Sequence, residues 1–292
     1  MVRIAFVANL ALALGALACC AWHAWPDRDR LTFLATATVY GVLLEQLVII
    51  AFEAYRYNVA DYILTVGDVP VVIGFGWAAI IYAGYETAHR LSVSRPVLPA
   101  FVALFALNID LAIDAVAIRV PFWQWTPPGA WFGVSLGNFL GWYLVAFLFA
   151  GAWLVLSERA AAALGAGWPA RLLTAVGTVV LAVAGLTAGL EAWTRFTETT
   201  PGKVAVLAVV VVASLVVVLR DEPVPRRLDP RIAAVPLAYH GFYFALLVAF
   251  EMYVEQPWLP VVSAMMIVLG LTVHVGALPR FRREPAAADG TG

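Results

Sequence analysis

Nine long apolar segments make up most of the chain, and this feature limits the possible folds most strongly. Each segment approaches the roughly 20 residues that a helix needs to cross the hydrocarbon core of a bilayer. The sequence therefore predicts an all-α polytopic membrane protein, a bundle of about nine transmembrane helices with a range of seven to nine. The segments cover residues 4–22, 31–54, 69–89, 98–118, 137–156, 172–192, 204–219, 232–253 and 259–278.

The composition agrees with a chain that is solvated mainly by lipid. Hydrophobic residues make up 63% of the sequence and charged residues 13%, about half the charged share of an ordinary soluble protein. A net charge of −1 offers no basic surface for nucleic acid, so we expect no nucleic-acid partner. We predict a single transmembrane helical domain over 1–278. The tail at 279–292, basic and then rich in Ala and Gly, is expected to be disordered.

The distribution of basic residues predicts the orientation. If the nine segments span the membrane, alternate connections lie on opposite sides, and cytoplasmic loops carry the excess of Lys and Arg. Because the larger set falls on the side that holds the C-terminus, we expect a plasma-membrane protein with its N-terminus outside and its C-terminus in the cytoplasm. The smaller set is Arg3, Arg56, Arg119, Arg195 and Lys203, and the larger is Arg28, Arg30, Arg90, Arg95, Arg159, Arg171, Arg220, Arg226, Arg227, Arg231, Arg280, Arg282 and Arg283.

Ionisable side chains inside the predicted spans are the strongest candidates for function, because each is costly to place in lipid. Glu45 lies deep in the second span, and Asp110 and Asp114 lie one helical turn apart in the fourth. Two carboxyls at this spacing repel each other when both are ionised, so one of them is expected to hold a proton. A purely structural hydrogen-bond network remains the alternative for all three.

An aromatic connection follows the span that carries the two aspartates. Residues 121–133 read PFWQWTPPGAWFG and include Trp123 and Trp125, and Asn138 and Trp142 follow at the start of the next span. One interpretation is an aromatic belt at the membrane surface, where Trp is enriched. The other is a rigid aromatic cover over the outer end of the carboxylate-bearing helix.

These residue types are compatible with acid catalysis on an apolar substrate. A desolvated carboxyl that keeps its proton can act as a general acid, and aromatic faces can stabilise a cation. Protonation of a hydrophobic alkene needs both. We find no phosphate-binding glycine loop, zinc signature, haem ligand pair or dinucleotide fingerprint, so we expect no cofactor and no metal.

The stretch at 108–143 resembles the carotenoid biosynthesis membrane family that includes the carotenoid 1,2-hydratases of the bisanhydrobacterioruberin hydratase type. Upstream, Glu45, the Tyr55-Arg56-Tyr57 triplet and GDVPVVIGFGW at 67–77 are similar to further elements of that family. Ala115 and Ser135 stand where the family usually has proline. The matching positions in the main stretch are Asp110, Asp114, Trp123, Trp125, Phe132, Gly133, Leu136, Asn138, Phe139, Gly141 and Trp142.

The resemblance implies a membrane-embedded hydratase that adds water across the terminal double bond of an acyclic C40 or C50 carotenoid end group. It implies no cofactor, a hydrophobic polyene substrate, contact with membrane lipid, and other carotenoid-pathway enzymes as partners. The implied catalytic residues are Asp110, Asp114 and Glu45, and the implied substrate-binding residues are Asn108, Trp123, Trp125, Asn138, Trp142, Tyr55, Tyr57 and Trp77.

Two alternatives stay open at this stage. A non-catalytic carotenoid- or lipid-binding protein would use the carboxyls as a packing network. A prenyltransferase of carotenoid synthesis also has about nine helices, but it normally needs two aspartate-rich motifs to hold magnesium and diphosphate. This sequence offers only the D-x-x-x-D of Asp110 and Asp114.

Overall fold

The computed structural model describes residues 1–224 and 226–274, and every predicted apolar segment is a helix there. Eight helices in this part of the chain are long and apolar enough to cross a membrane, and the shorter α10 occupies the ninth segment. The all-α polytopic prediction is confirmed. The eight long helices are α1 (Val2–Ala24), α2 (Arg28–Phe52), α3 (Val71–Arg90), α4 (Leu98–Ala117), α5 (Leu136–Leu164), α6 (Trp168–Phe196), α7 (Thr200–Arg220) and α8 (Pro230–Ala249), and α10 covers Leu259–His274.

Short elements connect these helices. Within the described residues they are β1 (Tyr55–Tyr57), the 3-10 turn η1 (Val59–Asp61), β2 (Thr65–Val66), β3 (Val69–Pro70), β4 (Trp123–Trp125) and α9 (Met252–Glu255). The expected span at 232–253 ends earlier, at Ala249, because Glu251 adopts a left-handed backbone conformation with φ 52°. In contrast, α5 runs past the expected limit at 156 through an alanine-rich stretch that favours helix. It ends at Leu164, and Gly165 follows with φ 74°.

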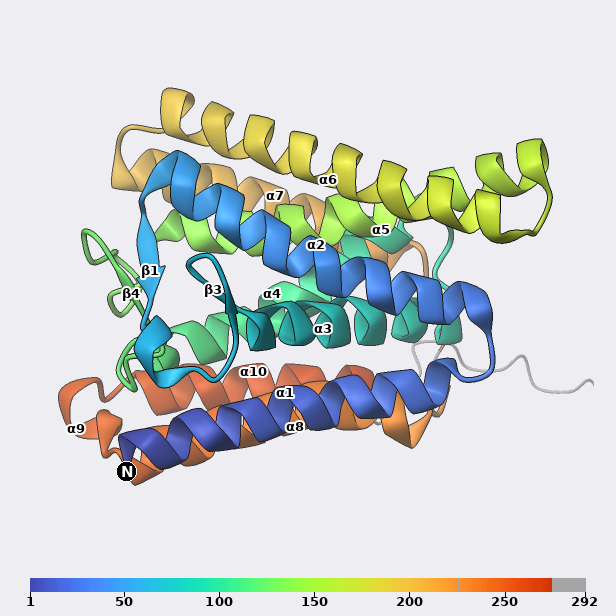
Figure 1. The fold of residues 1–292 in the computed structure, drawn as a ribbon. Helices are drawn as coiled ribbons and strands as arrows, with labels where there is room; N and C mark the ends of the chain where they lie inside the picture. Colours follow the sequence, from blue (N-terminus) through green and yellow to red (C-terminus); the bar gives the residue numbers. More distant parts are fainter. Residues whose placement is uncertain (225, 275–292) are drawn as a thin grey trace, which may run out of the picture.

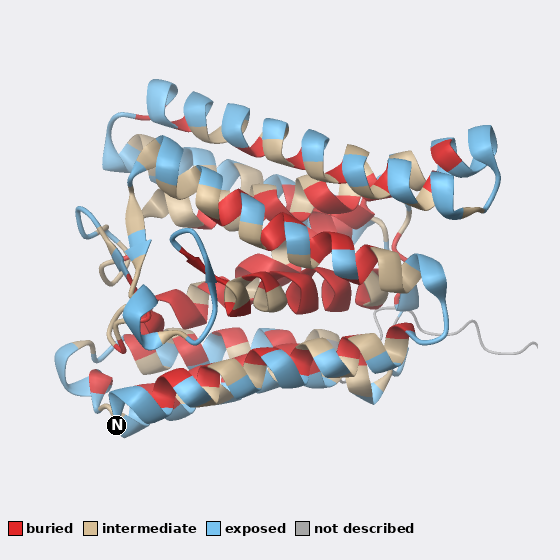
Figure 2. Cartoon of the chain, viewed as in Figure 1, coloured by how far each residue is buried: buried red, intermediate tan, exposed pale blue. Residues whose placement is uncertain are grey.

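The helices lie side by side with their connections gathered at two ends (Figure 1). The N-terminus, β1, β4 and α9 share one end, which we call the ladder end. The α1–α2, α3–α4, α5–α6 and α7–α8 connections lie at the other. The α4 helix is the most buried of the long helices, whereas α6 and α7 expose most of their surface (Figure 2). The carboxylate-bearing α4 is therefore shielded from lipid by its neighbours.

The predicted basic sets separate between these two ends. The smaller set, from Arg3 to Lys203, lies in or beside the ladder-end connections, and the described members of the larger set lie toward the opposite end. Arg280, Arg282 and Arg283, with the rest of the tail predicted at 279–292, lie outside the described residues.

The aromatic connection forms part of a small antiparallel ladder that a purely helical prediction missed. In this ladder β1 pairs with β4, so that Tyr55 lies opposite Trp125 and Tyr57 opposite Trp123. The β1 strand follows α2 and β4 follows α4, and the ladder therefore joins the ends of these two helices. It lies at one end of the bundle, on the left in Figure 1.

Two glycines let α2 and α3 approach each other closely. A Cβ atom placed on Gly74 would lie 2.8 Å from the carbonyl oxygen of Thr38 and 2.5 Å from Cγ2 of Val42. A Cβ on Gly41 would lie 3.0 Å from Cα of Gly74. Small residues at such contacts are the usual means by which membrane helices pack backbone to backbone. The contact holds Glu45 of α2 and Trp77 of α3 within reach of each other.

The variant Gly74→Ala should destabilise the bundle by about 1–3 kcal/mol, because the new methyl group meets backbone that cannot move away cheaply. A lower melting temperature of the detergent-solubilised protein would register this. Gly15→Ala is the matched control, since a Cβ there has no neighbour within 4 Å. Equal melting temperatures for the two variants would contradict the close α2–α3 packing.

Candidate functional site

Glu45, predicted to lie deep in the second span, is buried at the ladder end of α2 and has three hydrogen-bond donors. Tyr55 and Tyr57 of β1 donate their hydroxyls to Oε2, the latter at 2.9 Å. The indole N–H of Trp77 in α3 donates to Oε1 at 2.7 Å. Three donors on one carboxyl group are an arrangement that stabilises the ionised form.

The strand geometry of β1 explains why both tyrosines reach the same carboxyl. Alternate side chains of a strand point to the same face, so Tyr55 and Tyr57 share a face and Arg56 points away from it. The pKa values of Tyr55 and Tyr57 are raised well above the usual range of tyrosine. The larger cause is burial, and the second is the adjacent Glu45 carboxyl. Both hydroxyls therefore keep the protons that they donate.

The predicted aspartate pair in α4 is held together by one amide. Asn138 Nδ2 lies 2.9 Å from Oδ2 of Asp110 and 2.8 Å from Oδ2 of Asp114. Both carboxyls are buried, and Trp123 of β4 is a further hydrogen-bond partner of Asp114. One amide nitrogen between two carboxyls cannot neutralise two negative charges, and a proton shared by the pair relieves their repulsion.

The turn before α5 places Asn138 next to α4. Gly133 adopts φ 93°, which a glycine tolerates at little cost, and the Ser135 hydroxyl then caps the helix by accepting from the backbone N–H of Gly137. Arg119 fastens this turn to the end of α4, because its Nη1 donates to the carbonyls of Ala115 and Phe132 at 2.6 and 2.9 Å.

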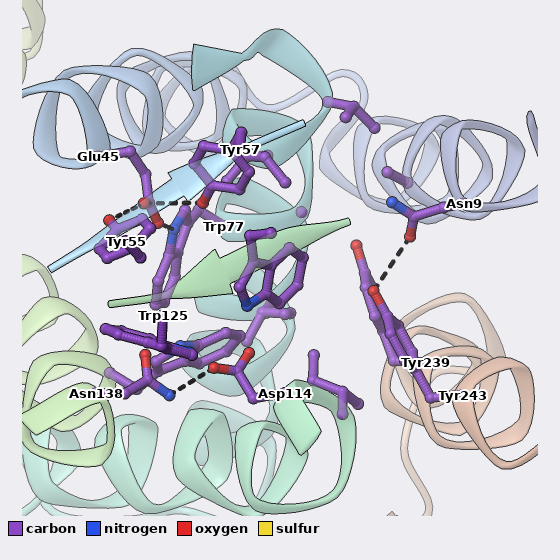
Figure 3. A pocket seen from close by; sticks show the side chains of 18 residues that line it. Asn9, Glu45, Tyr55, Tyr57, Trp77, Asp114, Trp125, Asn138, Tyr239 and Tyr243 are labelled. Carbon is purple, nitrogen blue, oxygen red and sulfur yellow. Dashed lines mark hydrogen bonds between the residues drawn. The ribbon is translucent and has the colours of Figure 1, made fainter. Parts of the chain in front are cut away.

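The two carboxylate clusters face one internal cavity, which we call the small cavity (Figure 3). The volume of the small cavity is about 70 Å³, several times the roughly 10–15 Å³ that one ordered water needs. Nine of the predicted site residues line it: Glu45, Tyr55, Tyr57, Trp77, Asp114, Trp123, Trp125, Asn138 and Trp142.

A larger space, the lateral cavity, lies between α2, α5 and α6 and has a volume of about 450 Å³. Apolar side chains such as Val48 on α2 and Leu186 and Leu190 on α6 form much of its wall. Glu198 and Lys203, near the α6–α7 connection, contribute a polar rim. Its inner wall is shared with the small cavity through Glu45, Tyr55, Trp77, Trp125, Asn138 and Trp142.

Aromatic rings form this shared wall. The ring centroids of Trp77 and Trp142 lie 4.2 Å apart, and the ring centroids of Tyr55 and Trp125 lie 4.8 Å apart. A group that passes from the lateral cavity to the small cavity would meet these ring faces and the Glu45 carboxylate together.

Two predicted site residues do not line either cavity. Asp110 lies behind Asp114 and reaches the site through Asn138. Asn108 lies elsewhere, at the contact of α4 with α8 and α10. There it donates to the carbonyl of Met266 at 3.2 Å and pairs with Nε2 of His240 at 3.1 Å. Asn108 precedes Asp110 by two residues, which turns its side chain by about 200° around the helix.

The far wall of the small cavity was missed from sequence. It comprises Asn9 of α1 and Tyr239 and Tyr243 of α8 (Figure 3). Asn9 stands alone as a strongly polar side chain in an apolar run, and the two tyrosines are four residues apart and so share a helix face. These signals place polar groups inward, but nothing in the sequence brings α8 to the carboxylates. Among the described residues, no group of three or more His, Cys, Asp or Glu could hold a metal ion.

Comparison with known proteins identifies the family. A family model described as "Carotenoid biosynthesis protein" matches residues 5–200, which is more than half of the chain. The chain therefore belongs to this family, as the resemblance of residues 108–143 predicted, and it is a membrane protein of the carotenoid pathway. The comparisons with curated proteins and with solved structures gave no match to the chain.

Proposed function

We propose that this member of the carotenoid biosynthesis protein family is a hydratase, which adds water across the terminal double bond of an acyclic C40 or C50 carotenoid. One observation carries the proposal: Asp114, one of a buried aspartate pair, and the separately bonded Glu45 border one small cavity, and a largely apolar chamber adjoins it. Family membership supports a hydrophobic carotenoid as the substrate class.

The polyene reaches the site from the side of α6. The lateral cavity lies just inside this peripheral helix, and its wall is largely apolar. Burial of an apolar chain between α2, α5 and α6 is favourable whether it comes from water or from loosely packed lipid. The end group then lies against the shared aromatic wall, with its terminal double bond directed at the small cavity.

Asp114 donates the proton. It lines the small cavity, whereas Asp110 lies behind it and shares one proton with it, while both carboxyls accept hydrogen bonds from the Asn138 amide. Transfer of this proton to the less substituted carbon of the terminal double bond breaks the π bond. A tertiary carbocation remains on the carbon that bears the two methyl groups.

The aromatic wall and Glu45 stabilise this cation. The ring faces of Trp125 and Trp142 carry a negative electrostatic potential that attracts a cation. Glu45 supplies a carboxylate that its three hydrogen-bond donors hold in place. Water then forms the C–O bond, and the proton that it releases restores the Asp114 carboxyl. The sum of these steps is the addition of one water, and no electron carrier takes part.

We expect Asp114→Asn to lower the formation of hydrated carotenoid by at least about 100-fold, the usual contribution of a positioned general acid. Asp110→Asn should cause a smaller loss, because the donor itself remains. The test is to express each variant in cells that accumulate an acyclic carotenoid and to measure product mass for the gain of one or two waters. Full activity of Asp114→Asn at normal protein level would contradict the assignment. Unaltered carotenoid that co-purifies with the wild-type protein would instead favour a binding protein.

Leu190→Trp should reduce hydration of long acyclic carotenoids by about tenfold or more, because a larger side chain narrows the lateral cavity. Leu181→Trp is the matched control, since Leu181 lies on the exposed face of the same helix at 54% exposure. Comparison of product yields at equal protein level provides the measurement. If both variants act alike, the substrate does not use the lateral cavity.

The proposal also includes the membrane orientation. The larger basic set predicts that the end opposite the ladder faces the cytoplasm, which leaves the site near the outer surface of the plasma membrane. Other carotenoid-pathway enzymes would then exchange pigment with this protein through the lipid.

Single cysteines test this orientation in a variant whose Cys19 and Cys20 are replaced by alanine. A membrane-impermeant maleimide should label Ile63→Cys in intact cells, because Ile63 is 82% exposed in the connection that leads from the ladder to α3. Leu164→Cys, at the opposite end, should react only after lysis. The reverse pattern would invert the topology.

A further inference from the structure

The wall of the small cavity opposite the carboxylates is polar although no charged group lies in it. Tyr243 donates its hydroxyl to Oδ1 of Asn9 at 3.3 Å, which joins α8 to α1. Tyr239, one turn before Tyr243, also lines the cavity, and its hydroxyl has no hydrogen-bond partner among the described residues. Figure 3 shows the three side chains across the cavity from Glu45.

The Tyr239 hydroxyl is deeply buried and aimed into the cavity. The residue is only 4% exposed, and its oxygen lies over Gly76 of α3, where a Cβ atom would approach it to 3.1 Å. The missing side chain at Gly76 leaves room for this hydroxyl. Because buried hydroxyls in proteins nearly always have a hydrogen-bond partner, we expect a small polar molecule to bind at this wall.

We propose that this wall holds the nucleophilic water of the hydration, with Tyr239 as its positioning residue. The inference rests on the proposed function. It gives a binding position to the attacking water, for which the proposal above names no binding residue. The water donates a hydrogen bond to the Tyr239 oxygen, and this directs one of its lone pairs toward the centre of the cavity. Asn9 and Tyr243 fix the wall behind it.

The attack balances in atoms and charge. The water oxygen forms a bond to the tertiary carbocation, and the resulting oxonium loses one proton to the Asp114 carboxylate that supplied the first. Tyr239 neither gains nor loses a proton in this step. The α8 helix, which carries Tyr239 and Tyr243, lies beyond residues 5–200, the segment that the family model matches, so family similarity does not report on these two tyrosines.

A tertiary carbocation can be captured by water or can lose a proton, and the wall selects between these two outcomes. Capture by water gives the alcohol. Loss of a proton from a neighbouring carbon returns an alkene, either the substrate or a double-bond isomer. In D2O the first protonation places deuterium on carbon, so a returned alkene can carry deuterium without having gained water. Deuterium in unhydrated carotenoid therefore marks cations that water failed to capture.

Tyr239→Phe tests this in membranes that carry the full-length protein, supplied with an acyclic carotenoid in D2O. We expect the alcohol to fall about tenfold, the effect of one lost positioning hydrogen bond, while deuterium in the unhydrated carotenoid rises. Tyr253→Phe is the matched control, because it removes the same hydroxyl from an exposed position on α9. Mass spectrometry of the extracted pigment measures both quantities, and a blot measures the protein.

The outcomes separate the inference from the hydratase proposal. Wild-type yield of alcohol in Tyr239→Phe overturns the inference, and so does a parallel loss of alcohol and deuterium, since that pattern marks a structural defect. A wild-type protein that gives neither alcohol nor deuterium contradicts the hydratase proposal itself, and the inference falls with it.

Discussion

The need to give every buried carboxyl a partner from the chain itself organises the ladder end of this bundle. Inside a membrane protein there is little water to solvate an anion, so donors must arrive from neighbouring elements. Glu45 obtains three donors from β1 and α3, and the aspartates of α4 obtain theirs from α5 and β4. Six elements, α2 and α4 with the four that supply donors, thus meet at three acidic side chains. The glycine contact between α2 and α3 and the turn before α5 then make these approaches sterically possible.

The two carboxylate clusters differ in a way that suits different tasks. Glu45 is surrounded by donors that keep their protons, which favours a fixed negative charge. The aspartates share a single amide, which favours a mobile proton. The two roles proposed above, proton donor and counter-charge, therefore require only different surroundings for the same carboxyl group, a principle known from enzymes that use paired carboxyls. The division follows from how many donors each cluster meets.

Much of this site could be predicted because its residues break a strong pattern. Against a chain that is 63% hydrophobic, a glutamate or an aspartate inside a span is conspicuous, and Glu45, Asp110 and Asp114 were found in this way. Asn108 was expected to bind substrate beside them, yet the helical rotation turns it toward α8 and α10. The ladder and the far wall could not be foreseen. Short strands in a connection carry little periodic signal, and the pairing of α8 with the cavity depends on packing between helices far apart in the sequence.

The β1–β4 ladder makes the site sensitive to chain length as well as to residue identity. Side chains alternate along a strand, so the Tyr55-Arg56-Tyr57 triplet presents its two phenols to Glu45 only in the observed register. A deletion of one residue between α2 and this strand would exchange the faces and turn the guanidinium of Arg56 inward. Two hydrogen-bond donors would be replaced by a full positive charge beside the carboxylate. The length of this connection thus determines which charge faces Glu45 in the cavity, although the connecting residues themselves need not contact a bound molecule.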